Sequence, residues 1–177
     1  VGNTKIITEH DNLFTLANTY TYLNGNTVQT GASATSPIKR TLQARLDELV
    51  SIKAFGATGD GTDQTTIIQR AVDQLYINSS TKGTTQSRVT LFFPAGTYLI
   101  NQTINLPPFA SLVGEGMDKT VIQMTGNDTA FHTVNELSTP GNYADASTNT
   151  NANQARNIHL QGMTISTAST TNPILNL

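Results

Sequence analysis

The chain has 177 residues, a formal net charge of −2 and a pI of about 5.8, which leaves no electrostatic case for binding nucleic acid or an anionic membrane. Cysteine is absent, so disulfides are excluded, and no apolar run reaches the roughly 18 residues of a membrane-spanning helix. Charged residues are few while Thr, Asn, Ser and Gly are abundant, a composition that suits a β-solenoid and would also suit a linker.

Residues 1–35 are expected to form a small β region. The segments 20–23 and 27–29 flank Asn24-Gly25, a hairpin signal because both residues tolerate the left-handed backbone conformation. A lone hairpin is marginally stable in water, so it would pack on a partner chain or on sister chains of a trimer. The alternative is a frayed small β-subdomain.

Residues 36–50 carry the pattern of a short helix, with Ser36 as N-cap and Pro37 at the first helical position. Four apolar residues at spacings of four, four and three form one narrow seam: Ile38, Leu42, Leu46 and Leu49. Such a short helix is marginal alone, so the seam must be buried. It would pack either in a parallel bundle around a threefold axis or on its own domain.

Residues 51–77 predict a short strand over 51–53, a glycine turn and a helix that ends near residue 77. Three glycines mark positions that need a positive φ or a close backbone approach: Gly56, Gly59 and Gly61. Asp63 is the expected helix N-cap. The helix carries one apolar stripe, made of Ile67, Ile68, Ala71, Val72 and Leu75. An amphipathic helix of this kind suits the polar cap that a solenoid end requires.

Short strands separated by corners follow, and they favour a parallel β-helix over a sandwich. The expected strands are 89–93, 97–100, 103–106, 111–113 and 121–124. Residues 138–156 are too polar to pack a core and are interpreted as a loop insertion in the solenoid. Residues 174–177 begin another strand, so we expect the segment to be the front of a longer chain.

Four motifs in the same order resemble those of the pectate-lyase-like right-handed β-helix family, in the form found in bacteriophage tailspikes and tail appendages. The motifs are Val50-Ser51 with Phe55-Gly56-Ala57, Gly59-Asp60-Gly61 and Thr62-Asp63; Phe93-Pro94-Ala95-Gly96-Thr97-Tyr98; Leu112-Val113-Gly114-Glu115-Gly116 with Thr120-Val121-Ile122; and Asn157 to Ile165. The sequence departs slightly, with Gln64 where the family often has a second Asp. The resemblance covers residues 50–177 and implies an all-β right-handed parallel β-helix, with residues 51–177 as its first coils behind a capping helix.

The resemblance also decides how the seam is interpreted, because phage tailspikes carry a short trimeric neck helix immediately before the β-helix. We therefore expect a homotrimer with Ile38, Leu42, Leu46 and Leu49 near the axis. In the family the sugar-cleaving or sugar-binding groove lies farther along the solenoid or between subunits. None of the family's catalytic residues can be transferred to this segment, so no catalytic residue is predicted here.

The carboxylates suggest two sites, and each has a simpler explanation. Asp60 and Asp63 lie close enough for a calcium site, but Ca²⁺ needs six to eight oxygen ligands. A turn stabilised by Asp60 and a helix capped by Asp63 are favoured. Glu115 and Asp118 could be spaced like a glycosidase pair. Nothing in the sequence places them in a cleft, and carboxylates in turns are usually solvated.

The three histidines, His10, His132 and His159, have no metal-ligand spacing, and His159 is expected to point away from the core. The glycines at 56, 59 and 61 do not predict a phosphate-binding loop, because the carboxylate of Asp63, which follows them, would repel a phosphate. We therefore predict no cofactor and no metal.

Two functions remain open. The first is the structural N-terminal part of a trimeric phage tailspike or tail fibre in the virion tail, assembled in the host cytoplasm. Residues 1–35 would bind a baseplate or tail protein, and a downstream body would recognise or depolymerise host-surface polysaccharide. The second is the front of a secreted, monomeric polysaccharide lyase or glycoside hydrolase with the same fold.

Overall fold

The computed structural model describes residues 20–21, 39–40, 49–77, 89–144, 156–169 and 171–176. The chain divides into two compact units, Val1–Glu48 and Leu49–Leu177. In the first unit, strand β1 (Tyr20–Thr21) pairs antiparallel with strand β2 (Lys39–Arg40). No described helix is long and apolar enough to cross a membrane.

One expectation for residues 1–50 needs correction. The strand that begins at Tyr20 pairs with Lys39–Arg40. Its predicted hairpin partner at 27–29 lies outside the described residues, so that hairpin stays a prediction. The helix predicted over 36–50 does not span that range, because Lys39–Arg40 forms β2 and Leu49–Ser51 forms β3. Pairing with distant strands overrides a local helical pattern at both places. Ile38, Leu42 and Leu46 lie outside the described residues.

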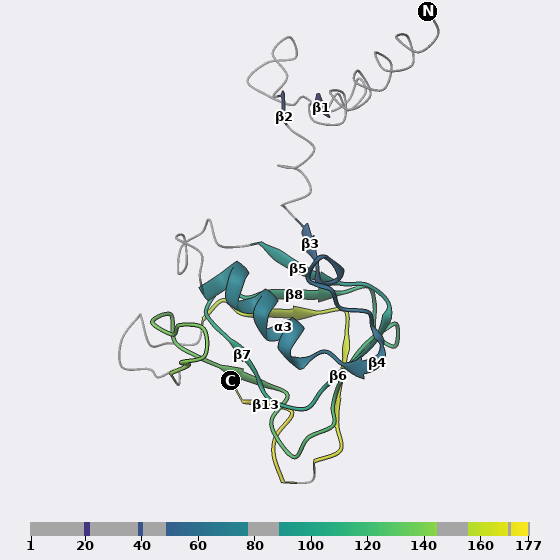
Figure 1. Cartoon of the computed structure of the whole chain (residues 1–177), viewed down its shortest axis with the longest axis vertical. Helices are drawn as coiled ribbons and strands as arrows, with labels where there is room; N and C mark the ends of the chain where they lie inside the picture. The colour runs from purple at the N-terminus through teal and green to yellow at the C-terminus, as the bar shows by residue number, and fades with distance from the viewer. Residues whose placement is uncertain are drawn as a thin grey trace, which may run out of the picture. The chain divides into compact units, whose positions relative to one another are not determined.

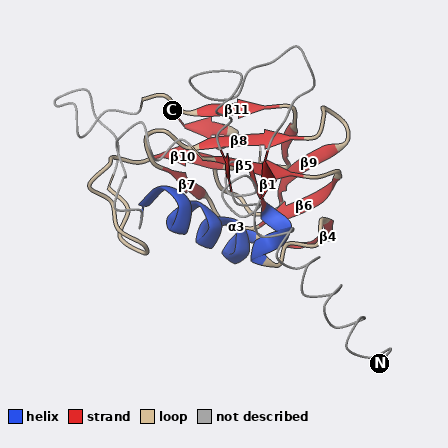
Figure 2. Ribbon diagram, turned by 90° about the horizontal axis from the view of Figure 1, so that it is seen from above, coloured by secondary structure: helices blue, strands red, loops and turns tan. Residues whose placement is uncertain are grey.

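The second unit is a parallel β-helix of three sheets (Figures 1 and 2). Its first sheet has the order β11-β8-β5-β3, its second β12-β9-β6-β4 and its third β13-β10-β7, and all pairs within them are parallel. The strands of the first sheet are β3 (Leu49–Ser51), β5 (Thr90–Phe93), β8 (Ser111–Gly114) and β11 (His159–Gln161). Those of the second are β4 (Asp60–Asp63), β6 (Gly96–Ile100), β9 (Thr120–Met124) and β12 (Thr164–Thr167). Those of the third are β7 (Ile104–Leu106), β10 (Phe131–Thr133) and β13 (Leu175–Asn176).

Each turn of the chain adds one strand to each sheet, except the first turn. There, β3 and β4 are followed by helix α3 (Thr65–Val72), which continues as the π-helical turn η2 (Asp73–Ile77). Figure 2 shows α3 along one end of the stacked strands. The helix therefore occupies the place of a third strand and covers the end of the solenoid, as a cap must.

Buried and outward-facing side chains alternate along the strands, and the buried ones form the core. In β6, Tyr98 and Ile100 are buried, and in β9 the buried side chains include Ile122 and Met124. The Tyr98 ring meets the Phe93 ring edge to face, with centroids 5.5 Å apart. The buried face of α3 belongs to the same cluster through Ile68, Ala71 and Val72. The apolar stripe predicted for the helix is therefore the face that packs on the core.

The fold class predicted from the sequence is confirmed, and most strand predictions lie within one or two residues of the observed bounds. Within the β-helical unit, strands β4 and β10 are not among the predicted strands. Residues 51–53 do not continue a strand, because η1 (Ile52–Phe55) is a 3-10 turn whose N-cap Ser51 accepts a hydrogen bond from the Lys53 N–H. Gly56, Gly59 and Gly61 have the positive φ angles expected of them.

Candidate functional site

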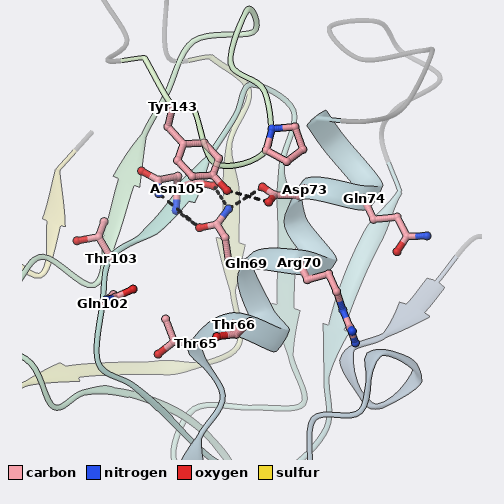
Figure 3. Close-up of a pocket in the computed structure, with 11 residues that line it drawn as sticks. Thr65, Thr66, Gln69, Arg70, Asp73, Gln74, Gln102, Thr103, Asn105 and Tyr143 are labelled. Atoms are coloured by element: carbon pink, nitrogen blue, oxygen red, sulfur yellow. Dashed lines mark hydrogen bonds between the residues drawn. The ribbon is translucent and has the colours of Figure 1, made fainter.

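A groove of about 800 Å³ lies beside the capping helix (Figure 3). One wall comes from α3 and the start of η2, namely Thr65, Thr66, Gln69, Arg70, Asp73 and Gln74. The other comes from β7, the residues before it and a loop after β10, namely Gln102, Thr103, Asn105, Pro140 and Tyr143. Its volume is within the range of small-molecule sites, about 300–1,000 Å³, and every lining residue except Pro140 has a polar or charged side chain.

The floor of the groove is a side-chain amide that replaces a strand. Gln69 Oε1 accepts the backbone N–H of Asn105 at 2.7 Å, and Gln69 Nε2 donates to the Asn105 carbonyl at 3.3 Å. A carboxamide carries the same donor and acceptor as a peptide group. Gln69 therefore satisfies the edge of β7 where the first coil offers no strand.

Asp73 joins this amide to the loop above it. Gln69 Nε2 donates to Asp73 Oδ1 at 2.8 Å, and the Tyr143 hydroxyl donates to Asp73 Oδ2 at 2.8 Å. Burial raises the pKa of Tyr143, and its hydrogen bond to the Asp73 carboxylate raises that pKa further. Tyr143 stays protonated at neutral pH, and the carboxylate is held in a fixed orientation.

A tight turn presents Tyr143 to the helix. Thr139 and Asn142 exchange backbone hydrogen bonds of 3.0 and 2.8 Å around Pro140-Gly141, where Gly141 has a φ of 78°. The Ala144 N–H then donates to Ser138 Oγ at 3.1 Å. These residues begin the loop that we predicted over 138–156, and the part over 145–155 lies outside the described residues.

The lining is suited to binding, and it does not supply a hydrolytic pair. Asp73 is the one carboxyl group among the lining residues, and Arg70 is the one cation. A typical glycoside hydrolase uses two carboxyl groups across the bond that it cleaves. The remaining polar side chains are amides and hydroxyls, which donate and accept hydrogen bonds without changing their protonation state.

Asp60 and Asp63 engage the turn and the helix start. Asp60 Oδ1 accepts the hydroxyls of Thr58 and Thr62 at 2.8 and 2.7 Å, and hydrogen bonding to Thr62 and then Thr58 lowers the pKa of Asp60. Asp63 Oδ1 accepts the Thr65 N–H at 3.0 Å. Asp63 itself is the last residue of β4, and the N-cap position belongs to Gln64, one residue later than expected.

The other titratable candidates lie apart from the groove. Glu115 Oε2 accepts the Ala95 N–H at 2.9 Å, and Asp118 Oδ1 accepts the Thr164 hydroxyl at 3.4 Å. Both carboxylates therefore hydrogen-bond to neighbouring coils of the solenoid. His159 is exposed on β11, as expected, and His132 Nδ1 lies 2.9 Å from the Asn176 amide. Within the described ranges, no three His, Cys, Asp or Glu residues gather as metal ligands. His10 lies outside those ranges.

Residues 49–175 match the family model described as rhamnogalacturonase A/epimerase, pectate lyase-like. The chain belongs to this family. The match confirms the pectate-lyase-like resemblance found in the sequence motifs, and it coincides with the β-helical unit that begins at Leu49.

Among curated proteins, the chain is 31% identical over 124 residues to a putative phage-related protein, YobO, of Bacillus subtilis, covering 70% of this chain and 12% of that protein. It is 42% identical over 67 residues to a glucan 1,3-beta-glucosidase of Cochliobolus carbonum, covering 37% of this chain and 7% of that protein. A solved structure, ORF18 of Geobacillus virus E2, aligns with 33% identity and a TM-score of 0.46 over 52% of this chain and 18% of that one. The chain thus spans about a tenth of the length of the curated relatives.

Sequence inspection missed the groove residues of this pectate-lyase-like unit. Gln69 and Asn105 are 36 positions apart, and Asp73 and Tyr143 are 70 positions apart, so no local pattern joins them. Of the predicted seam, Leu49 alone is described: it lies in β3 with 52% of its side chain exposed. Leu49 is not among the residues that line the groove.

Proposed function

We propose that this chain is the virion-proximal part of a trimeric phage tail protein, a tailspike or tail fibre, whose β-helical body recognises or depolymerises host-surface polysaccharide. The observation that carries the proposal is the capped solenoid end. Helix α3 closes the first coil, and a separate compact unit precedes that coil in the chain. A β-helix that begins behind another unit suits an appendage that is anchored at one end.

The comparisons support the phage and polysaccharide parts of this proposal. The relative that covers 70% of the chain is described as putatively phage-related. The family description names a rhamnogalacturonase, and the second relative is named as a glucan glucosidase, so sequence relatives of this chain carry the names of carbohydrate-cleaving enzymes. Within the proposal, residues 1–35 bind a baseplate or tail protein, and residues downstream of this segment meet the polysaccharide.

A measurement of molar mass in solution tests whether the chain forms the proposed trimer. The proposed contact is the apolar pair Leu42 and Leu46, which keeps its helical spacing of four within residues 41–48, between β2 and β3. Ile38 and Leu49 lie outside that stretch. Burying one leucine contributes about 1.5–3 kcal/mol, and a threefold axis repeats each contact. Leu46→Asp would place three carboxylates together in an apolar seam, where desolvation and repulsion oppose association.

Light scattering on the parent chain should give about three times the 18.9 kDa mass of one chain. The Leu46→Asp variant should give the monomer mass and keep the far-UV spectrum of a folded solenoid, because each coil packs on its own neighbours. The matched control is Leu137→Asp, which alters an equally apolar side chain that is 66% exposed on the solenoid, and should leave the parent mass unchanged. A monomeric parent would contradict the trimer.

The glucosidase relative favours a second candidate, the front of a polysaccharide lyase or glycoside hydrolase that acts as a monomer. It matches 67 residues at 42% identity, a higher identity over a shorter stretch than the phage-related relative. The same mass measurement separates the two candidates, since only the first requires association.

A further inference from the structure

We propose that the groove beside α3 is a binding site for a short neutral saccharide, separate from whatever site the downstream coils form. The choice of a saccharide rests on the proposed function, while the groove itself rests on the geometry of Gln69, Asp73 and Tyr143. Figure 3 shows these three side chains converging at its centre, between the helix and β7.

The centre of the groove is set in place before any ligand arrives. Gln69 is held by the Asn105 backbone, and Asp73 is held by Gln69 and Tyr143. A carboxylate offers about four lone-pair sites, and the described hydrogen bonds use one on each oxygen. Asp73 can therefore accept further hydroxyl groups without giving up its present partners, and little ordering is needed when a ligand binds.

The walls offer side chains that are not engaged elsewhere. Gln74 on the helix side and Gln102 on the β7 side are exposed, and no hydrogen bond within the described part of the chain uses their amides. Tyr143 adds an aromatic ring, half-buried, whose face can pack on the C–H groups of a sugar ring. A sugar presents hydroxyls at its edge and C–H groups on its face, and this lining matches both.

The charge at the centre of the groove disfavours an anion. Arg70 and Asp73 are the charged groups in the lining, but the Arg70 guanidinium donates to the carbonyl of Phe55, which does not line the groove. An anion would therefore face the Asp73 carboxylate. An apolar molecule would cover the amides without satisfying their hydrogen bonds, which is unfavourable. A hydroxyl-rich neutral molecule avoids both penalties.

Calorimetric titration of the 177-residue chain tests this inference, with laminaritetraose as the neutral probe and trigalacturonate as the anionic one. We expect laminaritetraose to bind at millimolar concentration or below. In the double variant Gln74→Ala/Gln102→Ala, the loss of two hydrogen bonds should raise its Kd roughly tenfold or more. Both glutamines are exposed, so the variant should fold like the parent.

The control is Gln123→Ala, which removes an equally exposed glutamine from the second sheet, outside the groove, and should leave the Kd unchanged. The inference is overturned if laminaritetraose does not bind, if the double variant binds like the parent, or if only trigalacturonate binds. Mass is measured on the same sample. A trimer that binds no neutral sugar refutes the groove site alone, and a monomer that binds it refutes only the proposed trimer.

Discussion

The first coil of the solenoid meets the second coil in two different ways. On the first two sheets, β3 and β4 pair with β5 and β6 through their backbones. On the third sheet, β7 meets the Gln69 side chain. Both arrangements satisfy an exposed strand edge. Backbone pairing fills the edge completely, whereas a side-chain substitute leaves room beside it, and the groove occupies that room.

The largest loss of stability is expected on the first two sheets, where the coils pair through their backbones. At the corner between the first and second sheets, a Cβ on Gly114 would overlap the Gly162 carbonyl oxygen and approach the Thr120 side chain at 2.9 Å. Gly114→Ala must therefore move backbone, and we expect it to lower the free energy of unfolding by about 3 kcal/mol, the upper part of the range for overpacking.

Gly116→Ala is the matched control, two residues away. A Cβ there would meet only the flexible Lys119 side chain, at 3.4 Å or more. Its unfolding free energy should stay within about 0.5 kcal/mol of the parent's. Urea denaturation followed by circular dichroism measures both variants, and equal stabilities would show that the corner has room to relax.

A smaller loss of stability is expected on the third sheet, where the Gln69 side chain takes the place of a strand. Gln69→Leu keeps the size of the side chain but leaves the N–H and C=O of Asn105 without their partner. The expected loss is about 1–3 kcal/mol. Gln74→Leu, on the same helical segment and exposed, should change stability by no more than about 0.5 kcal/mol. If the two variants unfold alike in urea, Gln69 does not act as a substitute strand.

The third loss of stability appears only at high pH. It concerns Tyr76, whose hydroxyl joins the capping helical segment to the first sheet. The Tyr76 hydroxyl lies 2.7 and 2.8 Å from the carbonyl oxygens of Val89 and Ser111, and burial raises its pKa from 10.0 to about 12. The folded state holds this proton more tightly than the unfolded state does. Its contribution is therefore complete below about pH 10 and is lost as the pH rises towards about 12.

Denaturation midpoints measured across this pH window should fall for the parent and fall less steeply for Tyr76→Phe, which has no hydroxyl to titrate. Tyr98, whose pKa is also raised by burial, adds a decline of the same sign in both proteins. Parallel curves for parent and variant would mean that Tyr76 does not hold its proton on folding.

The contrast between the two faces also explains what could be predicted. Strands such as β6 and β9 alternate buried and outward residues, and that pattern is local, so the sequence reveals it. Strand β4 was missed because Asp60-Gly61-Thr62-Asp63 consists of turn residues, and its pairing with β6 shifts register between Asp60 and Asp63.

Long-range contacts account for the remaining errors. The helix predicted over 36–50 is wrong at Leu49 because Leu49–Ser51 pairs with Thr90–Phe92, about 40 positions away. The groove depends on Gln69 reaching Asn105 and on Asp73 reaching Tyr143. Glutamine and aspartate on the outer side of an amphipathic helix look like ordinary solvated residues, so only the three-dimensional structure distinguishes them.

The central claim is that a side chain closes the third sheet and thereby forms the groove, and amide hydrogen exchange at Asn105 tests it most directly. The Asn105 N–H donates to Gln69 Oε1 at 2.7 Å, so it should exchange as slowly as the strand-paired amides of β10. In Gln69→Leu it should exchange much faster, while the β10 amides stay protected. Fast exchange at Asn105 in the parent, or equal protection in both proteins, would contradict the account.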